Sequence, residues 1–449
     1  MLPSSPPRLT IVKSSAVLNR PRLVEPTAES SAWPRPVARR PRVAQLVLTL
    51  CAGGAERLAI ELSLGLAARY GMSVICLEEP GTLAGALVDR GIEVAAIHRR
   101  QGFRPSLART LAAMTRDRGI DVLHCQQYSP YVYGALARLL RPSLRIVYTE
   151  HGRLSDAPPS KKRTAINPLL APLADGIYAV SRDLRRHMLA EGHPASRVDV
   201  ITNGIDVGKA PSQIESRRAR LELSIPGDAL VFGTAARLDP VKDLVTLIDA
   251  FAVVRAEVPA ARLVIVGDGP EREALERRAA EHGARAAIVF TGYRADVRSL
   301  LPACDVYVNS SISEGISLTI LEAMAARLAV IATRVGGTPE VVNRDDSGLL
   351  VPARDPAALA RAMLTLARDP GYRTRLASRG RKVVEARFTL DRMVDDYARV
   401  YEAAYAQRAA RYRRSGLRAE GSGLRTDGSG LRAHGSCPDV QTPFLRRAP

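Results

Sequence analysis

Two charged pairs in the second half of the chain have residue types and spacings suited to binding a phosphorylated ligand. Arg237 and Lys242 stand five positions apart, directly after an apolar run at 229–235. An arginine fork and a lysine ammonium can converge on a diphosphate. Glu314 and Glu322 stand eight positions apart in the segment SISEGISLTILEAMA. The first pair is therefore suited to a diphosphate, but taken alone it is explained at least as well by two solvated surface charges.

The segment around the two glutamates predicts a helix that begins near Ile316. Glu314 then lies in the loop before the helix, and Glu322 lies about two turns inside it. Carboxylates beside a phosphate site are unfavourable unless they accept hydrogen bonds from sugar or ribose hydroxyls. The alternative is an N-cap acid followed by a residue on a solvated helix face. In the first interpretation, four backbone amides form an anion site at the helix N-terminus: those of Gly315, Ile316, Ser317 and Leu318.

A glycine pair in the first half has the same relation to a predicted strand and helix. Gly53 and Gly54 follow an apolar run at 44–50 and precede an amphipathic segment. Without side chains, they let the backbone approach a ligand closely at a helix N-terminus. A plain tight turn explains the pair equally well, because it lacks the full G-x-G-x-x-G pattern.

The elements that must position these residues are short apolar runs that alternate with amphipathic segments. Continuous apolar runs separated by helices are typical of parallel strands buried on both faces. The fold class is therefore α/β, with two tandem Rossmann-like, doubly wound parallel sheets. Ligands of such sheets bind at the carboxyl ends of the strands, so we expect the site in a cleft between two domains. The runs lie near 44–50, 73–77, 94–97, 121–125, 145–149 and 177–180, and near 229–235, 263–267, 287–292, 305–310, 329–333 and 348–352.

Composition places the domain boundaries. Residues 1–42 are rich in Pro, Ser and Arg and predict a disordered basic tail, and residues 411–449, where SGLR recurs, predict a second low-complexity tail. Between them we expect an N-terminal acceptor domain at 43–206, a polar linker at 207–222 and a C-terminal donor domain at 223–389. A helix at 390–410 is expected to pack back on the N-terminal domain.

The net charge of +19 is concentrated in the two tails. The remaining positive charge suits a protein that handles anionic phosphates or touches an anionic membrane surface, and no nucleic-acid-binding signature accompanies it. Five scattered cysteines without a C-x-x-C pair indicate a reducing cytoplasm. No run of eighteen uncharged apolar residues predicts a transmembrane helix, and the N-terminus does not resemble a secretory signal.

The ordered motifs resemble those of a known family. AARLDPVK, VIVGDGPE, FTGY, SEGISLTILEAMA, VGGTPEVV and SGLLVP occur in the order found in the donor domain of family-four retaining glycosyltransferases with the GT-B fold, the glycosyl transferases of group 1. GGAE, DVLHCQQ, YTEHG, AVS and NGID in the first half follow the same family's order. The resemblance covers roughly residues 44–405.

This resemblance implies a role for each matching residue. Arg237 and Lys242 would hold the diphosphate of a nucleotide sugar, Glu314 would bind hydroxyls of the donor sugar, and Glu322 would bind the ribose. His151 of YTEHG would lie near the transferred sugar, with His124 as a further candidate close by. The remaining donor-binding positions are Gly53 and Gly54 at the phosphate or sugar, the amides of 315–318 at the phosphates, and the base-side stretch Thr291–Arg294, including Gly292 and Tyr293.

Two positions depart from the family pattern. Many relatives have Gly before the arginine and Gly after the lysine, where this chain has Ala236 and Asp243. We expect the carboxylate of Asp243 to weaken the positive field of Lys242.

The predicted activity is a retaining, metal-independent glycosyl transfer from a nucleotide-diphosphate sugar to a glycan or lipid-linked acceptor. No D-x-D motif stands at a strand end, so no metal is expected, and the nucleotide sugar is a substrate, with no cofactor. Bacterial relatives suggest exopolysaccharide or cell-envelope glycan synthesis. The protein is expected in the cytoplasm, peripheral on the inner face of the membrane if the basic and apolar residues at 160–170 touch lipid. A core helix with a basic cap explains that segment equally well.

Two other functions fit the same fold. A nucleotide-sugar epimerase can share tandem Rossmann-like domains, although the Arg-x4-Lys and Glu-x7-Glu pairs favour transfer. A non-catalytic nucleotide-sugar-binding protein would keep the same site without the reaction. A pyridoxal-dependent phosphorylase would need a Schiff-base lysine and a larger chain.

Overall fold

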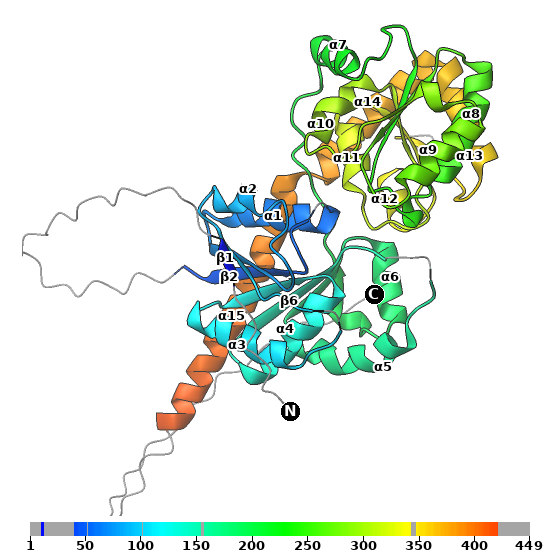
Figure 1. Ribbon diagram of the computed structural model, residues 1–449. Coiled ribbons are helices and arrows are strands. Elements are labelled where there is room, and N and C mark those ends of the chain that lie inside the picture. Colours follow the sequence, from blue (N-terminus) through cyan, green and yellow to red (C-terminus); the bar gives the residue numbers. More distant parts are fainter. Residues whose placement is uncertain are drawn as a thin grey trace, which may run out of the picture. The chain divides into compact units, whose positions relative to one another are not determined.

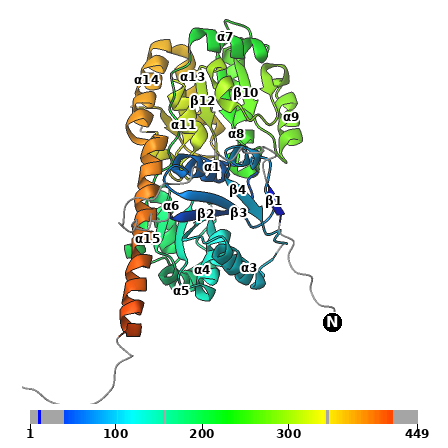
Figure 2. The same ribbon diagram turned by 90° about the vertical axis from the view of Figure 1, so that its left-hand side faces the viewer.

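The computed structural model describes residues 10–12, 40–51, 53–100, 102–153, 157–342 and 347–420, with side chains described between residues 40 and 406. Within these ranges the chain forms two separate sheets flanked by helices (Figures 1 and 2). This confirms the predicted α/β class with two tandem Rossmann-like, doubly wound sheets.

The first sheet has eight strands in the order β1-β4-β3-β2-β5-β6-β7-β8. Strand β1 pairs antiparallel with β4, and every other pair is parallel. The strands are β1 (Thr10–Val12), β2 (Arg42–Val47), β3 (Gly71–Cys76), β4 (Glu93–Ala96), β5 (Val122–Gln126), β6 (Arg145–Glu150), β7 (Gly176–Ala179) and β8 (Val198–Val200).

Strand β2 shows why this sheet is buried on both faces. Its residues alternate between two apolar clusters: Ala44 and Leu46 pack into one, and Val43 and Val47 into the other. Because successive side chains of a strand point to opposite faces, both faces must be covered. The helices of this half are α1 (Gly54–Leu66), α2 (Gly85–Val88), α3 (Ser106–Asp117), α4 (Tyr128–Leu140), α5 (Lys161–Leu170) and α6 (Arg182–Ala190).

The second sheet is entirely parallel and has the order β11-β10-β9-β12-β13-β14. Its strands are β9 (Val231–Ala235), β10 (Arg262–Val266), β11 (Ile288–Phe290), β12 (Val306–Asn309), β13 (Ala329–Thr333) and β14 (Leu349–Val351). Its helices are α7 (Gln213–Glu222), α8 (Leu244–Glu257), α9 (Arg272–Glu281), α10 (Val297–Leu300), α11 (Leu318–Ala325), α12 (Thr338–Val341), α13 (Pro356–Arg368) and α14 (Pro370–Arg387).

Two strands of the first sheet were not predicted. Strand β1 lies within the tail predicted to be disordered, where the β-branched run Thr-Ile-Val pairs with β4. Strand β8 is only three residues long and carries a charged residue at its centre, so it gives little periodic signal. Residues 1–9 and 13–39 of the predicted tail lie outside the described residues.

The segment predicted as a linker, 207–222, is mostly helical. Helix α7 covers Gln213–Glu222 and begins with a capping box between Ser212 and Glu215. Ser216 Oγ donates to the carbonyl of Pro302 at 2.7 Å, and Arg220 Nη2 lies 2.9 Å from Asp305 Oδ2. Residues 213–222 of the predicted linker therefore form a helix of highly polar composition, which side-chain contacts join to the second half.

Helix α15 (Leu390–Glu420) extends ten residues beyond the predicted end at 410, into the stretch predicted as a low-complexity tail (Figure 2). Its first part packs against the first sheet. Tyr401 Oη accepts a hydrogen bond of 3.0 Å from Gln45 Nε2, and Tyr70 Oη donates one of 3.1 Å to the carbonyl of Ala398. Residues 421–449 lie outside the described residues.

Among the helices of the described residues, none combines the length and the apolarity that crossing a bilayer requires.

Candidate functional site

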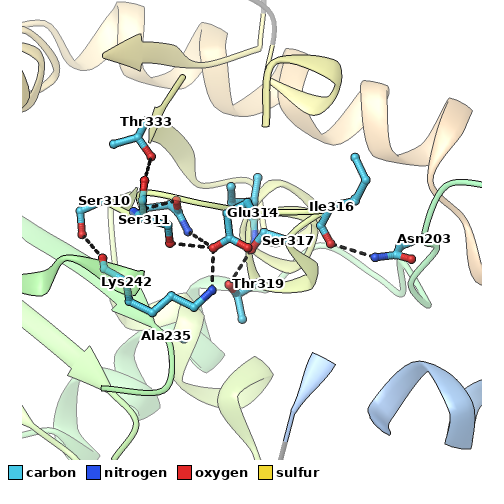
Figure 3. A network of polar contacts seen from close by, with 12 residues as sticks. Asn203, Ala235, Lys242, Ser310, Ser311, Glu314, Ile316, Ser317, Thr319 and Thr333 are labelled. Carbon is cyan, nitrogen blue, oxygen red and sulfur yellow. Dashed lines mark hydrogen bonds and ion pairs between the residues drawn. The ribbon is translucent and has the colours of Figure 1, made fainter. Parts of the chain in front are cut away.

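The loop after β12 brings Glu314 against Lys242. Strands β9 and β12 are neighbours in the second sheet, so the loops at their carboxyl ends meet although they are far apart in the chain. Three donors converge on Glu314 Oε1: Lys242 Nζ at 2.7 Å, Ser311 Oγ at 2.6 Å and Asn309 Nδ2 at 3.3 Å (Figure 3). No described residue donates to the other carboxylate oxygen, Oε2, which is therefore available to a ligand hydroxyl.

Asp243, next to the lysine, has its carboxylate bonded to helix α8. Its backbone is left-handed, with φ at 46°, a conformation that favours glycine. Its carboxylate caps helix α8 by accepting hydrogen bonds from Thr246 N at 3.4 Å and Thr246 Oγ1 at 2.8 Å. The carboxylate in contact with Lys242 is that of Glu314, so the predicted effect of Asp243 on the field of Lys242 would act without a direct contact.

The start of helix α11 leaves backbone amides free. The helix begins at Leu318, two residues later than predicted, and the Ser317 side chain caps it by accepting from Ile320 N at 3.4 Å. Within the described residues, no group accepts a hydrogen bond from the amides of 315–318. These amides and the helix dipole can therefore bind an anion.

Glu322 lies about one turn inside helix α11, rather than two, and is almost fully buried. Its Oε1 lies 2.8 Å from Arg57 Nη2 of helix α1, and its side chain is 1% exposed. Burial raises the pKa of Glu322, and the Arg57 guanidinium lowers it in opposition. Its Oε2 is buried and has no partner among the described residues. An unpaired buried carboxylate oxygen is costly, so this atom is suited to accept a hydrogen bond from a ligand.

The backbone of His151 lies against the loop that contains Gly315. A Cβ added to Gly315 would lie 2.1 Å from the carbonyl oxygen of His151, so only glycine fits there. Nearby, Asn203 Nδ2 donates to the carbonyl of Ile316 at 2.9 Å. His151, at the carboxyl end of β6, and the amides of 315–318 therefore belong to one site.

The two candidate histidines have different surroundings. His151 Nε2 contacts Gln126 Oε1 at 2.5 Å, while its Nδ1 is buried without a partner. Burial lowers the pKa of His151 to about 4, so the ring is neutral at neutral pH. His124 is fully buried, and both its ring nitrogens are bonded, Nδ1 to Tyr401 Oη at 2.7 Å and Nε2 to Thr149 Oγ1 at 2.8 Å. His124 therefore packs helix α15 and has no ring nitrogen left for a ligand.

The glycine loop of the first half lies near the start of helix α11. Gly53 is extended at the N-cap of α1, and a Cβ there would lie 2.1 Å from Glu56 Oε2, so the Glu56 carboxylate occupies that space. A Cβ on Gly54 would lie 3.9 Å from Leu318 Cδ1. The loop is therefore close enough to line the same site.

Three predicted residues are not joined to this cluster by any contact in the described residues. The Arg237 side chain is 68% exposed and lies 3.6 Å from Asp239. Gly292, with φ at 73°, accepts a hydrogen bond from Gly267 N at 3.0 Å, and Tyr293 is 51% exposed. They follow β9 and β11, so they lie at the same carboxyl edge of the sheet as Lys242.

Four residues of the site were not predicted individually. Asn203 and Gln126 fall inside the quoted motifs NGID and DVLHCQQ, so those motifs could have identified them. Ser311 is the first residue of the quoted segment SISEGISLTILEAMA, whereas Arg57 carries no local signal, because its role depends on which helices the fold brings together.

Comparisons with known proteins agree with this geometry. The family model of glycosyl transferases group 1 matches residues 215–383, and that of Glycosyltransferase Family 4 matches residues 52–209. EpsD of Bacillus subtilis, a glycosyltransferase by name, is 31% identical over 323 residues, which cover 68% of this chain and 83% of EpsD. The N-acetyl-alpha-D-glucosaminyl L-malate synthase of Bacillus anthracis is 27% identical over 66% of this chain and 78% of its own.

A solved structure shares the fold. Anabaena HepE, crystallised with UDP, superposes with a TM-score of 0.72 at 24% identity, over 81% of this chain and 100% of the HepE chain. The family models and the two largely parallel sheets lead to one conclusion: this chain belongs to the glycosyl transferases of group 1 and has the GT-B fold.

Proposed function

We propose that this chain is a retaining, metal-independent glycosyltransferase that uses a nucleotide-diphosphate sugar. The acceptor is a glycan or a lipid-linked glycan in bacterial exopolysaccharide or cell-envelope synthesis. One observation carries the proposal: the Lys242–Glu314 pair lies beside the free amides of 315–318, with an unpaired, buried Glu322 oxygen one turn further along. Family membership supports sugar transfer, and HepE, which shares the fold, binds UDP.

The positive groups of the site act on the leaving diphosphate. Glycosyl transfer passes through an oxocarbenium-like state while negative charge grows on the departing nucleotide. Lys242 and the amides of 315–318 are oriented before the substrate arrives, so they stabilise that charge without reorganisation. Arg237 follows strand β9, as Lys242 does, and its guanidinium adds a second cation. In this proposal, these protein groups compensate the negative charge of the leaving diphosphate.

The carboxylates bind hydroxyl groups. Glu314 Oε1 already accepts three hydrogen bonds, which lowers its nucleophilicity, while Oε2 is left for a sugar hydroxyl. Glu322 Oε2 accepts from the ribose. We therefore assign no residue as a covalent nucleophile. The acceptor attacks the face that the nucleotide leaves, its proton passes to the departing phosphate, and the anomeric configuration is retained.

Helix α5 supports an acceptor at a membrane surface. Lys161 and Lys162 are exposed at its start, and the exposed fractions of Ile166 and Leu169 are 44% and 74%. Lys162, Ile166 and Leu169 lie three or four positions apart, so they share one face of the helix. A basic and apolar face of this kind binds anionic lipid headgroups. Sedimentation with phosphatidylglycerol vesicles tests this, with Leu169→Glu expected to abolish binding.

The two rival functions differ in measurable products. An epimerase would convert a nucleotide sugar into a free isomer without an acceptor, and a binding protein would leave every donor unchanged. Glycosyl transfer instead releases nucleoside diphosphate in proportion to the glycosylated product. Incubation with donor alone and with donor plus acceptor therefore separates the three functions.

The first experiment is a thermal-shift screen of UDP-, GDP- and ADP-sugars on the wild type, Glu322→Ala and the exposed control Glu273→Ala. A ligand that binds the native state raises the melting temperature. We expect one nucleotide class to stabilise the wild type and the control but not the Glu322 variant. With that donor, the anomeric proton coupling of the product tests retention, and an inverted product would overturn the stereochemical assignment.

A further inference from the structure

A continuous chain of buried hydrogen bonds links helix α15 to His151. Tyr401 Oη of α15 accepts from Gln45 Nε2 at 3.0 Å, and Gln45 Oε1 accepts from Gln126 Nε2 at 2.7 Å. Gln126 Oε1 then meets His151 Nε2 at 2.5 Å. Gln45 and Gln126 are 0% and 1% exposed, so water does not compete for these bonds.

Each hydrogen bond in this series has a defined donor and acceptor. The Tyr401 hydroxyl accepts from Gln45, so its single proton is donated to His124 Nδ1 at 2.7 Å. His124 therefore carries its proton on Nε2 and donates to Thr149 Oγ1 at 2.8 Å, and Thr149 Oγ1 also shares a hydrogen bond of 3.0 Å with Tyr397 Oη. These bonds orient both glutamine amides at once.

The orientation of Gln126 determines what His151 meets. The Gln126 amide nitrogen faces Gln45 Oε1 and also lies 3.3 Å from His124 Nδ1, which has no proton. Its carbonyl oxygen must therefore face His151. Because a carbonyl oxygen only accepts, His151 Nε2 has to donate.

We propose that Gln126 is a positioning residue that holds His151 as its Nε2–H tautomer, and that Tyr401 of helix α15 maintains this orientation through Gln45. The consequence lies at the other ring nitrogen. His151 Nδ1 is buried, lacks a partner among the described residues and carries a lone pair. In this tautomer Nδ1 accepts a hydrogen bond from a hydroxyl of the bound sugar, whereas the opposite tautomer would present a second donor there.

The neutral state of the ring agrees with this assignment. Burial lowers the pKa of His151 to about 4, so at neutral pH the ring carries one proton, which the Gln126 bond places on Nε2. The ligand part of the inference rests on the proposed function, but the tautomer itself does not. The two can therefore fail separately.

The direct test is 15N NMR of the full chain labelled at histidine, with the His151 signals assigned by their loss in His151→Gln. We expect the wild type to show a protonated Nε2 and an unprotonated Nδ1 for His151. Gln126→Leu removes the acceptor and should give a mixture of tautomers. A wild-type ring protonated on Nδ1 would overturn the proposal.

A matched pair of tyrosine variants tests the link to helix α15. Tyr401→Phe removes the hydroxyl that orients Gln45. Tyr70→Phe removes another buried hydrogen bond to helix α15, to the carbonyl of Ala398, which is not part of the hydrogen-bond series that leads to His151. We expect a second His151 tautomer in Tyr401→Phe only. Equal spectra in the two variants would show that packing of α15, and not this hydroxyl, determines the tautomer.

Kinetics separate the positioning role from a folding defect. In Gln126→Leu, kcat should fall by about 10- to 100-fold, the usual effect of leaving one buried polar group without its hydrogen-bond partner. The melting shift induced by the free nucleoside diphosphate should be unchanged, because the nucleotide-binding groups are intact. An unchanged kcat with an altered tautomer would refute the role of Nδ1, and a wild type with the expected tautomer but no transfer would refute only the proposed function.

Discussion

The ammonium of Lys242 lies 2.7 Å from Glu314 Oε1, although the two residues stand 72 positions apart. Their strands, β9 and β12, are neighbours in the sheet, so both loops emerge at the same edge. The pair holds the lysine beside the amides of 315–318 before any substrate binds. Preorganisation of this kind is effective for stabilising developing charge, because no group has to move during the reaction.

Removal of this lysine should affect the chemical step. In Lys242→Ala we expect kcat to fall by about 10²- to 10³-fold, the usual effect of deleting one preorganised donor at a developing charge. The exposed Lys382 of helix α14 gives a matched control, and Lys382→Ala should leave kcat unchanged. Equal activities of the two variants would remove Lys242 from the site.

Glu322 should act mainly on donor affinity. Glu322→Gln keeps the shape but replaces a charged acceptor, and hydrogen bonds to charged groups contribute roughly 1.5–3 kcal/mol. We therefore expect the donor to bind about 10- to 100-fold more weakly, as titration calorimetry would measure. The exposed Glu273→Gln is the control. Unchanged affinity in Glu322→Gln would contradict the ribose assignment.

Gly315 tests how closely the site is packed. A Cβ at this position would lie 2.1 Å from the His151 carbonyl oxygen, which is backbone and cannot rotate away. Gly315→Ala should therefore destabilise the protein by about 1–3 kcal/mol and greatly reduce activity. Gly85→Ala, where a Cβ meets nothing within 4 Å, is the matched variant and should be tolerated. Denaturant unfolding and initial rates would compare the two, and a harmless Gly315→Ala would exclude the close approach.

Buried histidines should make stability depend on pH. Burial lowers the pKa of His193 from 6.5 to about 4. As pH falls through this window the unfolded chain binds a proton first, so the stability present above pH 6.5 is progressively lost. The loss from this residue at pH 4 is on the order of 3 kcal/mol. Urea unfolding at several pH values should show a shallower dependence in His193→Gln than in the wild type, and equal slopes would disprove the effect.

Metal removal tests the proposed source of positive charge. Lys242, Arg237 and the amides of 315–318 are assigned to compensate the diphosphate, so transfer should continue after dialysis against EDTA. The rate before and after dialysis, and after addition of Mg²⁺ or Mn²⁺, gives the measurement. A loss of activity that Mg²⁺ or Mn²⁺ restores would replace this part of the proposal with metal-assisted catalysis.

The sequence by itself determined the two sheets and most of their strands. Apolar runs such as 329–333 and 306–309 are buried on both faces, and this requirement appears directly in local composition. The sequence also placed Glu314 in a loop and Glu322 in the helix that follows, because helical spacing is a local property. Where pairing with distant residues decided the structure, the sequence pattern missed the element, as with the three-residue strand β1.

Only the tertiary structure decided which of these residues meet. Lys242 with Glu314, Arg57 with Glu322, and His151 with Gly315 are contacts between loops and helices that lie far apart in the chain. The surroundings of His124 and His151 are equally invisible in the sequence, because both follow apolar strand residues. The order of strands in the sheets and the packing of helix α15 determine these contacts, and no local pattern encodes them.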